Sequence, residues 1–436
     1  MKFMNSIVGL RYEEKYEMER RVAIVPHHVK KLVGKGIEFH VQTSAKRAFT
    51  DDSFEDAGAK VVSSLENASV IFGVKEMPLT FFEENKTYVF FSHVVKGQPY
   101  NMPMLRSMME KKCQLIDYEK IENEENKRLI FFGRFAGLAG MINSLWSLGQ
   151  RFKLQGIDTP FAHIRQAYTY PSLKQAREAV SKAGYEIAHN GLPESISPIV
   201  IGFTGYGNVS KGAQEIAHLL PSIEVTPQQL LDLDFNNAPK NLIYKVVFKE
   251  SDLSRPIDRT AVFDLQHYYG HPEFYENQFE KYVPKLSVLV NCIFWNNHYP
   301  RLVTKDFLEK LYSEGEPKLQ VIGDISCDPD GSIECTHKGT EIENPVFVYD
   351  PFTRKPTYGF GGKGILVMAV DILPSELPLE SSIAFSEALL PYVEQIVKAD
   401  YTKPFAELAL PQPIKKALIL HQGEFTPNYA YMKAFI

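Results

Sequence analysis

Short apolar runs alternate with amphipathic stretches along the first third of the chain. Each run is short enough to form a buried strand of a parallel sheet. These runs are Ser6–Tyr12, Ile37–Gln42, Ser69–Val74, Thr87–Ser92 and Gln114–Tyr118. Between them, helical spacing of apolar residues predicts helices from Pro26, over Asp51–Ala59 and over Asn101–Lys112. The repeated β-α-β order indicates a parallel sheet covered by helices.

The same alternation resumes after Pro198. We expect strands over Ile199–Thr204, Ser222–Val225, Leu242–Phe248, Ser287–Ile293 and Leu319–Ile325. Between the two alternating regions, the pattern predicts a strand over Arg128–Gly133, a helix over Ala136–Leu154 that is rich in small residues, and a helix over Leu173–Ala183 that stops at Gly184. A last helix is expected over Leu379–Ala399. Because 436 residues exceed one hydrophobic core, the chain is expected to hold two doubly wound, Rossmann-like α/β domains with parallel sheets.

Composition excludes several classes of protein. The formal net charge of -5 gives no electrostatic reason to expect nucleic acid or an anionic membrane as a partner. No apolar run reaches the roughly 18 residues that span a bilayer. The four cysteines are unevenly spaced and form no CxxC pair, which favours a reducing compartment and hence the cytoplasm. Cys335 and His337 are too isolated for structural zinc, so we expect no metal.

A glycine loop follows the run Ile199–Thr204 and precedes a helical stretch. It contains Gly205, Tyr206, Gly207, Asn208 and Val209. Gly205 permits the tight turn, and Gly207 allows a pyrophosphate to approach the backbone N–H groups at the start of the helix. The third glycine of the usual pattern is replaced by Ser210, which is small enough for close packing. The strand–loop–helix–strand order predicts a dinucleotide site.

The choice of nicotinamide cofactor depends on the end of the second strand. A site for NAD(H) places an acid there. Glu224 lies inside the strand over Ser222–Val225, and the neutral Thr226 lies at its end, although no arginine is near to hold a 2′-phosphate. On this reading NADP(H) is favoured over NAD(H).

Charged and polar groups also follow several apolar runs of the first domain. Because ligands gather at the carboxyl ends of parallel strands, these groups are candidates for one site. They are Lys75, Glu76, His93, Lys96, Gln98, Asp117, Glu119 and Arg128. A lysine beside acids and a histidine can supply general acid–base catalysis. The strands of any α/β protein end in polar loops. The residues alone therefore leave open whether these side chains come together in one site.

Three segments of the amino-terminal part resemble the alanine dehydrogenase/transhydrogenase superfamily. They are the arginine-bearing Glu19–Pro26, the lysine-bearing Gly73–Pro78 and the histidine-bearing Phe91–His93. Three more segments together resemble a narrower family, the lysine–2-oxoglutarate reductase half of bifunctional aminoadipic semialdehyde synthase, and more distantly the lysine-forming saccharopine dehydrogenases. These are Leu115–Glu119, Gly205–Gly212 and Val370–Pro378. The resemblance covers nearly the whole chain.

The resemblance implies that L-lysine, 2-oxoglutarate and a reduced nicotinamide cofactor give saccharopine through an imine. It implies that Lys75 is the base for the secondary amine and that His93 is the acid–base group for the carbinolamine. Glu76 and Glu119 would modulate their pKa values. Arg21, Lys96, Gln98 and Arg128 would hold substrate carboxylates. Gly207, Asn208 and Val209 would contact the pyrophosphate, and Cys292 and Asp324 would lie near the nicotinamide side.

The resemblance also implies a domain plan, with the active site in the cleft between the domains. Residues 1–137 and about 361–436 would form the substrate domain, and residues 138–360 the dinucleotide domain. Two alternatives stay open: an NAD-dependent saccharopine dehydrogenase that works oxidatively, and a non-catalytic module that senses lysine or a nucleotide. The number of subunits stays open as well, a homo-oligomer included.

Overall fold

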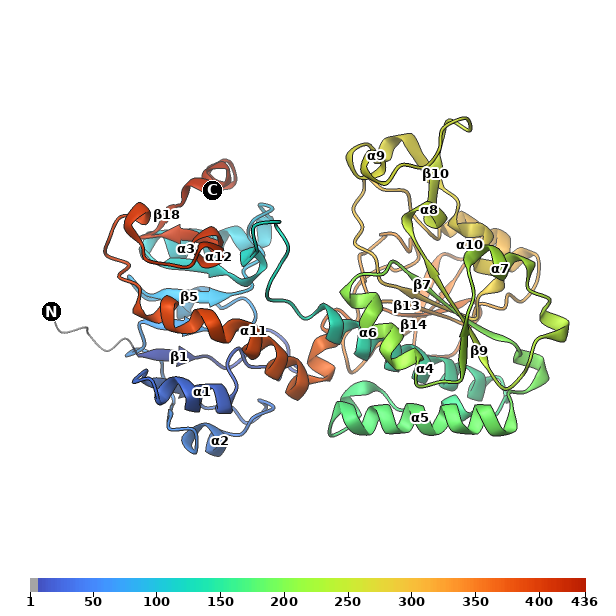
Figure 1. The fold of residues 1–436 in the computed structure, drawn as a ribbon, viewed down its shortest axis with the longest axis horizontal. Helices are drawn as coiled ribbons and strands as arrows, with labels where there is room; N and C mark the ends of the chain where they lie inside the picture. The colour runs from blue at the N-terminus through green and yellow to red at the C-terminus, as the bar shows by residue number, and fades with distance from the viewer. Residues whose placement is uncertain (1–6) are drawn as a thin grey trace. The chain divides into compact units, whose positions relative to one another are not determined.

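The computed structural model describes residues 7–436 and divides into two units, each built around its own eight-stranded sheet (Figure 1). Unit 1 holds the described residues up to Phe132 together with Pro378–Ile436, and unit 2 holds Gly133–Leu377. Both sheets are mainly parallel and carry helices, so the predicted fold class is confirmed.

Six parallel strands and two antiparallel ones form the sheet of unit 1. In sheet order they are β18 (Glu424–Phe425), β17 (Leu418–His421), β6 (Gln114–Asp117), β5 (Thr87–Phe90), β4 (Val70–Phe72), β1 (Val8–Leu10), β2 (Phe39–Gln42) and β3 (Lys60–Val62). From β1 the chain builds outward to β3 and then returns to place β4 on the other side of β1. A topological switch point therefore lies between β1 and β4.

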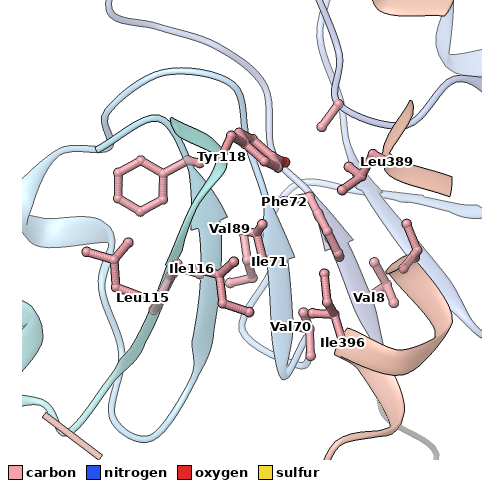
Figure 2. Packing of buried hydrophobic residues seen from close by; sticks show 14 of the residues in the cluster. Val8, Val70, Ile71, Phe72, Val89, Leu115, Ile116, Tyr118, Leu389 and Ile396 are labelled. Carbon is pink, nitrogen blue, oxygen red and sulfur yellow. The ribbon is translucent and has the colours of Figure 1, made fainter. Parts of the chain in front are cut away.

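The strands of the unit 1 sheet are buried, as the continuous apolar runs predict, except for the two edge strands β3 and β18. Helix α11 (Pro378–Lys398) covers the sheet with an apolar stripe that includes Leu389 and Ile396. Figure 2 shows these two side chains beside strand residues such as Val8 and Phe72. The other helices of unit 1 are α1 (Pro26–Val33), α2 (Asp51–Glu55), α3 (Met102–Glu110) and α12 (Gln412–Ala417).

The sheet of unit 2 also has six parallel strands and an antiparallel pair. In sheet order they are β15 (Lys355–Tyr358), β14 (Val346–Asp350), β16 (Ile365–Met368), β13 (Val321–Asp324), β12 (Val288–Asn291), β7 (Ile199–Thr204), β9 (Ile243–Phe248) and β8 (Ser222–Glu224). The switch point lies between β7 and β12. A separate hairpin pairs β10 (Ser254–Pro256) with β11 (Tyr275–Asn277).

The helices of unit 2 pack around this sheet. They are α4 (Gly133–Leu154), α5 (Leu173–Asn190), α6 (Asn208–Ala217), α7 (Pro227–Asp232), α8 (Glu250–Leu253), α9 (Leu265–Gly270) and α10 (Lys305–Ser313). Helices α4 and α6 approach unusually closely, because a Cβ atom at Gly137 would overlap the carbonyl oxygen of Val209, and one at Gly212 would overlap that of Arg134. Glycine at these positions lets one backbone lie against the other.

One strand expected from the sequence is absent, and one expected helix end is wrong. The strand expected over Arg128–Gly133 does not form: Arg128 makes only an isolated bridge to Glu122, and α4 already begins at Gly133. The helix expected to stop at Gly184 continues to Asn190. A Cβ atom at Gly184 would lie 2.5 Å from the carbonyl oxygen of Leu219, so this glycine permits close packing instead of ending the helix. The amino-terminal strand covers Val8–Leu10, and Ser6 of the expected run lies outside the described residues.

The return to unit 1 starts later than expected. Residues 361–377 lie in unit 2, because β16 pairs with β13 and β14 of the second sheet. At the first crossing, α4 lies against α6 already at Arg134 and Gly137, so unit 2 starts at Gly133 instead of residue 138. Among residues 7–436, none of the helices has both the length and the apolarity that crossing a bilayer requires.

Candidate active site

The carboxyl ends of β1, β4, β5 and β6 lie side by side at one edge of the sheet of unit 1. Their register pairs Leu10 with Phe72, Phe72 with Val89 and Phe90 with Asp117. The polar residues that follow these strands are therefore brought together, including Lys75, Glu76 and His93. This edge contains the switch point, which is where open α/β sheets bind their ligands.

Glu76 is the centre of the charged groups at this edge. Its Oε1 lies 2.7 Å from Nδ1 of His93, and its Oε2 lies 2.8 Å from Nζ of Lys15. Burial alone would raise the pKa of Glu76, but the hydrogen bonds and positive charges of His93 and Lys15 lower it to about 2. Glu76 is thus an anion at neutral pH. An anion facing Nδ1 favours the tautomer in which Nδ1 carries the proton and Nε2 is the acid–base atom.

Lys75 lies in the turn after β4, and the backbone of that turn is fixed by a buried acid. The carboxylate of Glu13, which follows β1, accepts hydrogen bonds from the backbone N–H of Val74 at 2.6 Å and of Lys75 at 2.9 Å. Burial raises the pKa of Glu13 to about 7, with a further contribution from Glu19, against the lowering effect of these two N–H groups. The Nζ atom of Lys75 lies 5.5 Å from the ring centre of Tyr16.

Asp117 fixes the neighbouring strand ends from inside the protein. It accepts hydrogen bonds from the side chain and the backbone N–H of Ser92, and from the backbone N–H of Glu119 at 2.7 Å. Burial raises the pKa of Asp117 to about 6. Glu119, whose side chain is mostly buried, forms an ion pair with the half-exposed Arg128. Of the candidates after β6, Asp117 therefore organises the backbone, while Glu119 and Arg128 pair with each other.

The remaining substrate candidates have different surroundings. Arg21 is buried and uses two of its nitrogens on Glu19, at 2.7 and 2.6 Å, while its guanidinium lies 4.1 Å from the ring centre of Phe132. Lys96 is exposed. The buried Oε1 of Gln98 has no hydrogen-bond partner among the described residues, so it can accept from a bound ammonium or amide group.

The turn that carries Lys96 and Gln98 is held from the carboxyl-terminal segment. The hydroxyl of Tyr431 donates to the carbonyl oxygen of Val95 at 2.7 Å. Gly97 has a φ of +67°, and a Cβ atom there would lie 2.6 Å from the ring of Phe435. The last residues of the chain thus shape the turn that follows His93.

The switch point of unit 2 carries the glycine loop. Gly205 follows β7 with a φ of +76°, and its N–H donates to the carbonyl oxygen of Phe248 at 2.8 Å. Helix α6 is ten residues long and begins at Asn208, with Gly207 as its N-cap and no side chain capping it. A Cβ atom at Gly207 would have no heavy atom within 4 Å. Uncapped N–H groups behind open space are what a pyrophosphate requires, so these residues fit a dinucleotide.

A buried polar network fixes the strand ends beneath the glycine loop. Asn291 accepts a hydrogen bond from Thr204 at 2.7 Å and donates to Asp324 at 2.8 Å. Asp324 also accepts from Ser326, Thr336 and the N–H of Cys327. Burial raises the pKa of Asp324 and that of the neighbouring Cys292 thiol. Asp324 is therefore a buried hydrogen-bond acceptor of this network. Cys292 lines a cavity of about 320 Å³ together with Gly205 and Gly207.

The strand used to judge the cofactor is not the neighbour of the glycine-loop strand. β8 (Ser222–Glu224) lies at the edge of the sheet, and β9 lies between it and β7. Glu224 instead pairs with the buried Lys245 at 2.7 Å. Thr226 is the N-cap of α7. The interpretation of Thr226 as a cofactor-selecting position is therefore wrong, and the argument for NADP(H) that depended on it is removed.

Two protein-family models match this chain. The models named alanine dehydrogenase/PNT, N-terminal domain, and alanine dehydrogenase/PNT, C-terminal domain, match residues 9–139 and 264–428. The chain belongs to this family. The resemblance predicted from the sequence is confirmed.

Individual relatives match over nearly the whole length of this chain. The chain is 38% identical over 449 residues to alpha-aminoadipic semialdehyde synthase of Arabidopsis thaliana, covering 99% of this chain and 42% of the relative. It is 36% identical to the mitochondrial alpha-aminoadipic semialdehyde synthase of Bos taurus, covering 98% of this chain and 48% of the relative. The chain thus spans less than half the length of these relatives. Saccharopine dehydrogenase [NAD(+), L-lysine-forming] of Yarrowia lipolytica is 27% identical, over 90% of this chain and 92% of its own length.

Solved structures agree on the fold. An L-alanine dehydrogenase matches with a TM-score of 0.63 at 17% identity, over 98% of this chain and 99% of its own. A transhydrogenase from Sinorhizobium meliloti matches with a TM-score of 0.53 at 14% identity, over 97% and 100%. Among residues 7–436, no three His, Cys, Asp or Glu side chains come together in a way that could hold a metal ion.

Several site residues had no signal in the sequence analysis. Glu13 and Lys15 lie in a charged stretch that reads as an ordinary surface loop, yet Glu13 is buried and Lys15 contacts Glu76. Asn291 lies inside an apolar strand, and a buried polar side chain in such a position usually has hydrogen-bond partners. A polar residue within an apolar run is therefore the sequence signal that could have indicated this buried network.

Proposed function

We propose that this chain is a nicotinamide-dependent oxidoreductase that condenses L-lysine with 2-oxoglutarate and reduces the product to saccharopine. The observation that carries the proposal is the match over 98–99% of the chain to proteins named alpha-aminoadipic semialdehyde synthase. The relatives named saccharopine dehydrogenase [NAD(+), L-lysine-forming] support the same substrate class. The reaction joins the ε-amine of lysine to the ketone carbon, releases water and reduces the resulting imine to a secondary amine.

The charged edge of unit 1 supports the acid–base part of this proposal. His93, oriented through Nδ1 by the anionic Glu76, would give and take protons at Nε2 as the carbinolamine forms and loses water. Lys75, whose backbone is held by Glu13, would take the proton of the amine when its own amino group is neutral. The cations Arg21, Lys96 and Arg128 would bind the carboxylates of the substrates, and Gln98 Oε1 would accept from an ammonium.

The glycine loop of unit 2 supports the redox part. The N–H groups of Gly207, Asn208 and Val209 would hold the pyrophosphate, and Cys292 lines the same cavity. A bound reduced nicotinamide supplies the hydride. The proposed reaction needs groups from both units, so neither unit is expected to be active alone.

An assay with defined substrates tests the proposal. Oxidation of reduced cofactor is followed with lysine and 2-oxoglutarate together, with each alone, and with ammonia and pyruvate. We expect turnover only when lysine and 2-oxoglutarate are both present, and the reverse reaction from saccharopine and oxidised cofactor. Turnover with ammonia and pyruvate, and none with lysine, would make the chain an alanine dehydrogenase. Binding of lysine and nucleotide without turnover in either direction would make it a sensing module.

Two expectations about the surroundings of the chain stay predictions. The cysteine pattern favours the cytoplasm, while the bovine relative is named as a mitochondrial protein. Homo-oligomer formation is tested by measuring the molar mass of the protein in solution by light scattering.

A further inference from the structure

Two of the proposed substrate residues, Lys96 and Gln98, lie on one short turn of unit 1. Residues 94–98, named here the substrate turn, follow strand β5. The N–H of Gly97 closes the turn by donating to the carbonyl oxygen of Val94 at 2.8 Å. A ligand that binds a turn has to order it, unless the protein already holds the turn in the binding conformation.

The residues just before the substrate turn are held from inside the protein. The side chain of Asn101 is buried, and its Nδ2 donates to the carbonyl oxygens of Ser92 at 3.0 Å and of His93 at 3.2 Å. These bonds fix the backbone of His93, the proposed acid–base residue. They end before the middle of the turn, where Lys96 lies.

The middle of the substrate turn is held by the 3₁₀ segment Pro427–Phe435. The hydroxyl of Tyr431 donates to the carbonyl oxygen of Val95 at 2.7 Å. The ring of Phe435 packs directly on the backbone of Gly97, because a Cβ atom there would lie 2.6 Å from the ring. The two contacts therefore flank Lys96 along the chain.

This segment uses different residues to anchor itself and to contact the turn. Tyr429 and Met432 are buried in the core of unit 1. Tyr431 and Phe435 are 52% and 42% exposed, so core packing does not account for them. Their contacts with the substrate turn are the contacts that distinguish them from the two anchors.

We propose that Tyr431 and Phe435 are positioning residues, which hold the substrate turn in the conformation that binds substrate. The buried Oε1 of Gln98, which no described residue satisfies, is then kept in place for a substrate ammonium group. Without the two contacts the turn would occupy other conformations, and the apparent affinity for substrate would fall with the fraction of competent turn. Proton transfer would be spared, because Asn101 holds His93 separately. The inference rests on the proposed function and adds residues that set its substrate affinity.

Calorimetric titration of the full chain with saccharopine tests the proposal, together with steady-state rates for saccharopine and oxidised nicotinamide cofactor. The double variant Tyr431→Phe/Phe435→Ala removes the hydrogen bond and the ring and leaves both core anchors in place. Phe435→Tyr keeps the ring and is the conservative variant. Lys433→Gln, at an exposed position of the same segment, is the matched control.

In the double variant, the Kd and the KM for saccharopine should rise about ten-fold, the scale of one lost hydrogen bond. The kcat, its pH profile and the KM for the cofactor should stay unchanged. Phe435→Tyr and Lys433→Gln should behave like the unchanged chain.

Unchanged saccharopine affinity in the double variant would overturn the inference and leave the proposed function standing. A parallel fall in kcat, cofactor affinity and thermal midpoint would also overturn it, because the segment would then only support the fold. Failure of the unchanged chain to bind or convert saccharopine would overturn the proposed function, and the inference with it.

Discussion

The two sheets of this chain have their switch points in the same relative place, and they use them differently. In unit 1 the N–H groups of Val74 and Lys75, in the turn after β4, are already bound by the carboxylate of Glu13, which follows β1. In unit 2 the corresponding place between β7 and β12 is open in front of Gly207. In unit 1 the N–H groups of a strand-to-loop turn bind an internal carboxyl group. In unit 2 we propose that such N–H groups bind the pyrophosphate of a ligand.

The surroundings of the two places follow from that difference. Unit 1 gathers ionisable side chains, with Glu76 between His93 and Lys15. In unit 2 the cavity lining is mostly glycine, aliphatic and aromatic, with Glu250 as its one carboxylate among the described residues, and the hydrogen-bonded network of Thr204, Asn291 and Asp324 lies below the loop. Proton transfer needs side chains that titrate, and dinucleotide binding needs oriented backbone. This difference supports our proposal that unit 1 supplies the acid–base groups and unit 2 binds the cofactor.

Lys75→Met should give the largest effect. The turnover rate should fall by roughly a hundred- to ten-thousand-fold, as is typical when a general acid–base group is removed, while cofactor affinity stays unchanged because the glycine loop belongs to the other unit. Steady-state rates and a calorimetric titration separate the two quantities. Lys60→Met, an exposed lysine of the same unit, is the control. Near-normal turnover of Lys75→Met with an unchanged pH profile would show that Lys75 is not an acid–base group of the reaction.

Gly207→Asp should have the next largest effect. Unlike Lys75→Met, it should act on cofactor affinity. A carboxylate there would take the open space in front of α6 and repel a pyrophosphate, so cofactor affinity should fall at least about a hundred-fold. The thermal midpoint should stay the same, since a Cβ atom at Gly207 meets nothing within 4 Å. Gly361→Asp, at another open glycine of unit 2, is the control. Unchanged affinity would show that the loop is only a turn.

Glu13→Gln should reduce turnover by about ten-fold, a smaller loss than Lys75→Met. An amide offers only one accepting oxygen, so one of the N–H groups of Val74 and Lys75 would face an NH₂ group, at a cost of about 1–3 kcal/mol. Because the pKa of Glu13 is about 7, the wild-type rate profile should contain a limb near neutral pH that the variant lacks. The exposed Glu17→Gln should change neither quantity. If the limb persists in Glu13→Gln, it belongs to another group.

The smallest effect concerns Glu376, a buried acid of unit 2 that accepts from Asn143 at 2.7 Å and from the N–H of Tyr168 at 3.1 Å. Burial raises its pKa from 4.5 to about 7. The folded state therefore holds an extra proton between these values, and its stabilising contribution is present below about pH 4.5 and lost as the pH rises through 7. Between pH 5 and pH 8, the free energy of unfolding should fall about 2 kcal/mol less in Glu376→Gln than in the wild type. Equal slopes in denaturant titrations would contradict this assignment.

The sequence predicted the elements well and their lateral order poorly. Apolar runs and the spacing of Gly205 and Gly207 are local signals, and the structure has β7, the turn and α6 where they were expected. The position of β8 at the edge of the sheet depends on long-range pairing, which leaves no mark in the strand itself. That one difference in strand order removed Thr226 from the place beside the glycine-loop strand. The burial of Glu13 was hidden for the same reason, since its partners lie 61 and 62 positions away.

The most direct test of the proposed reaction follows one nitrogen atom. Lysine labelled with ¹⁵N at the ε-position is incubated with 2-oxoglutarate, reduced cofactor and the chain, and the products are analysed by mass spectrometry. The account predicts a single labelled product that contains both carbon skeletons joined through the ¹⁵N, formed in equal amount to the cofactor oxidised. Label released as ammonia, or cofactor oxidised without a joined product, would contradict it.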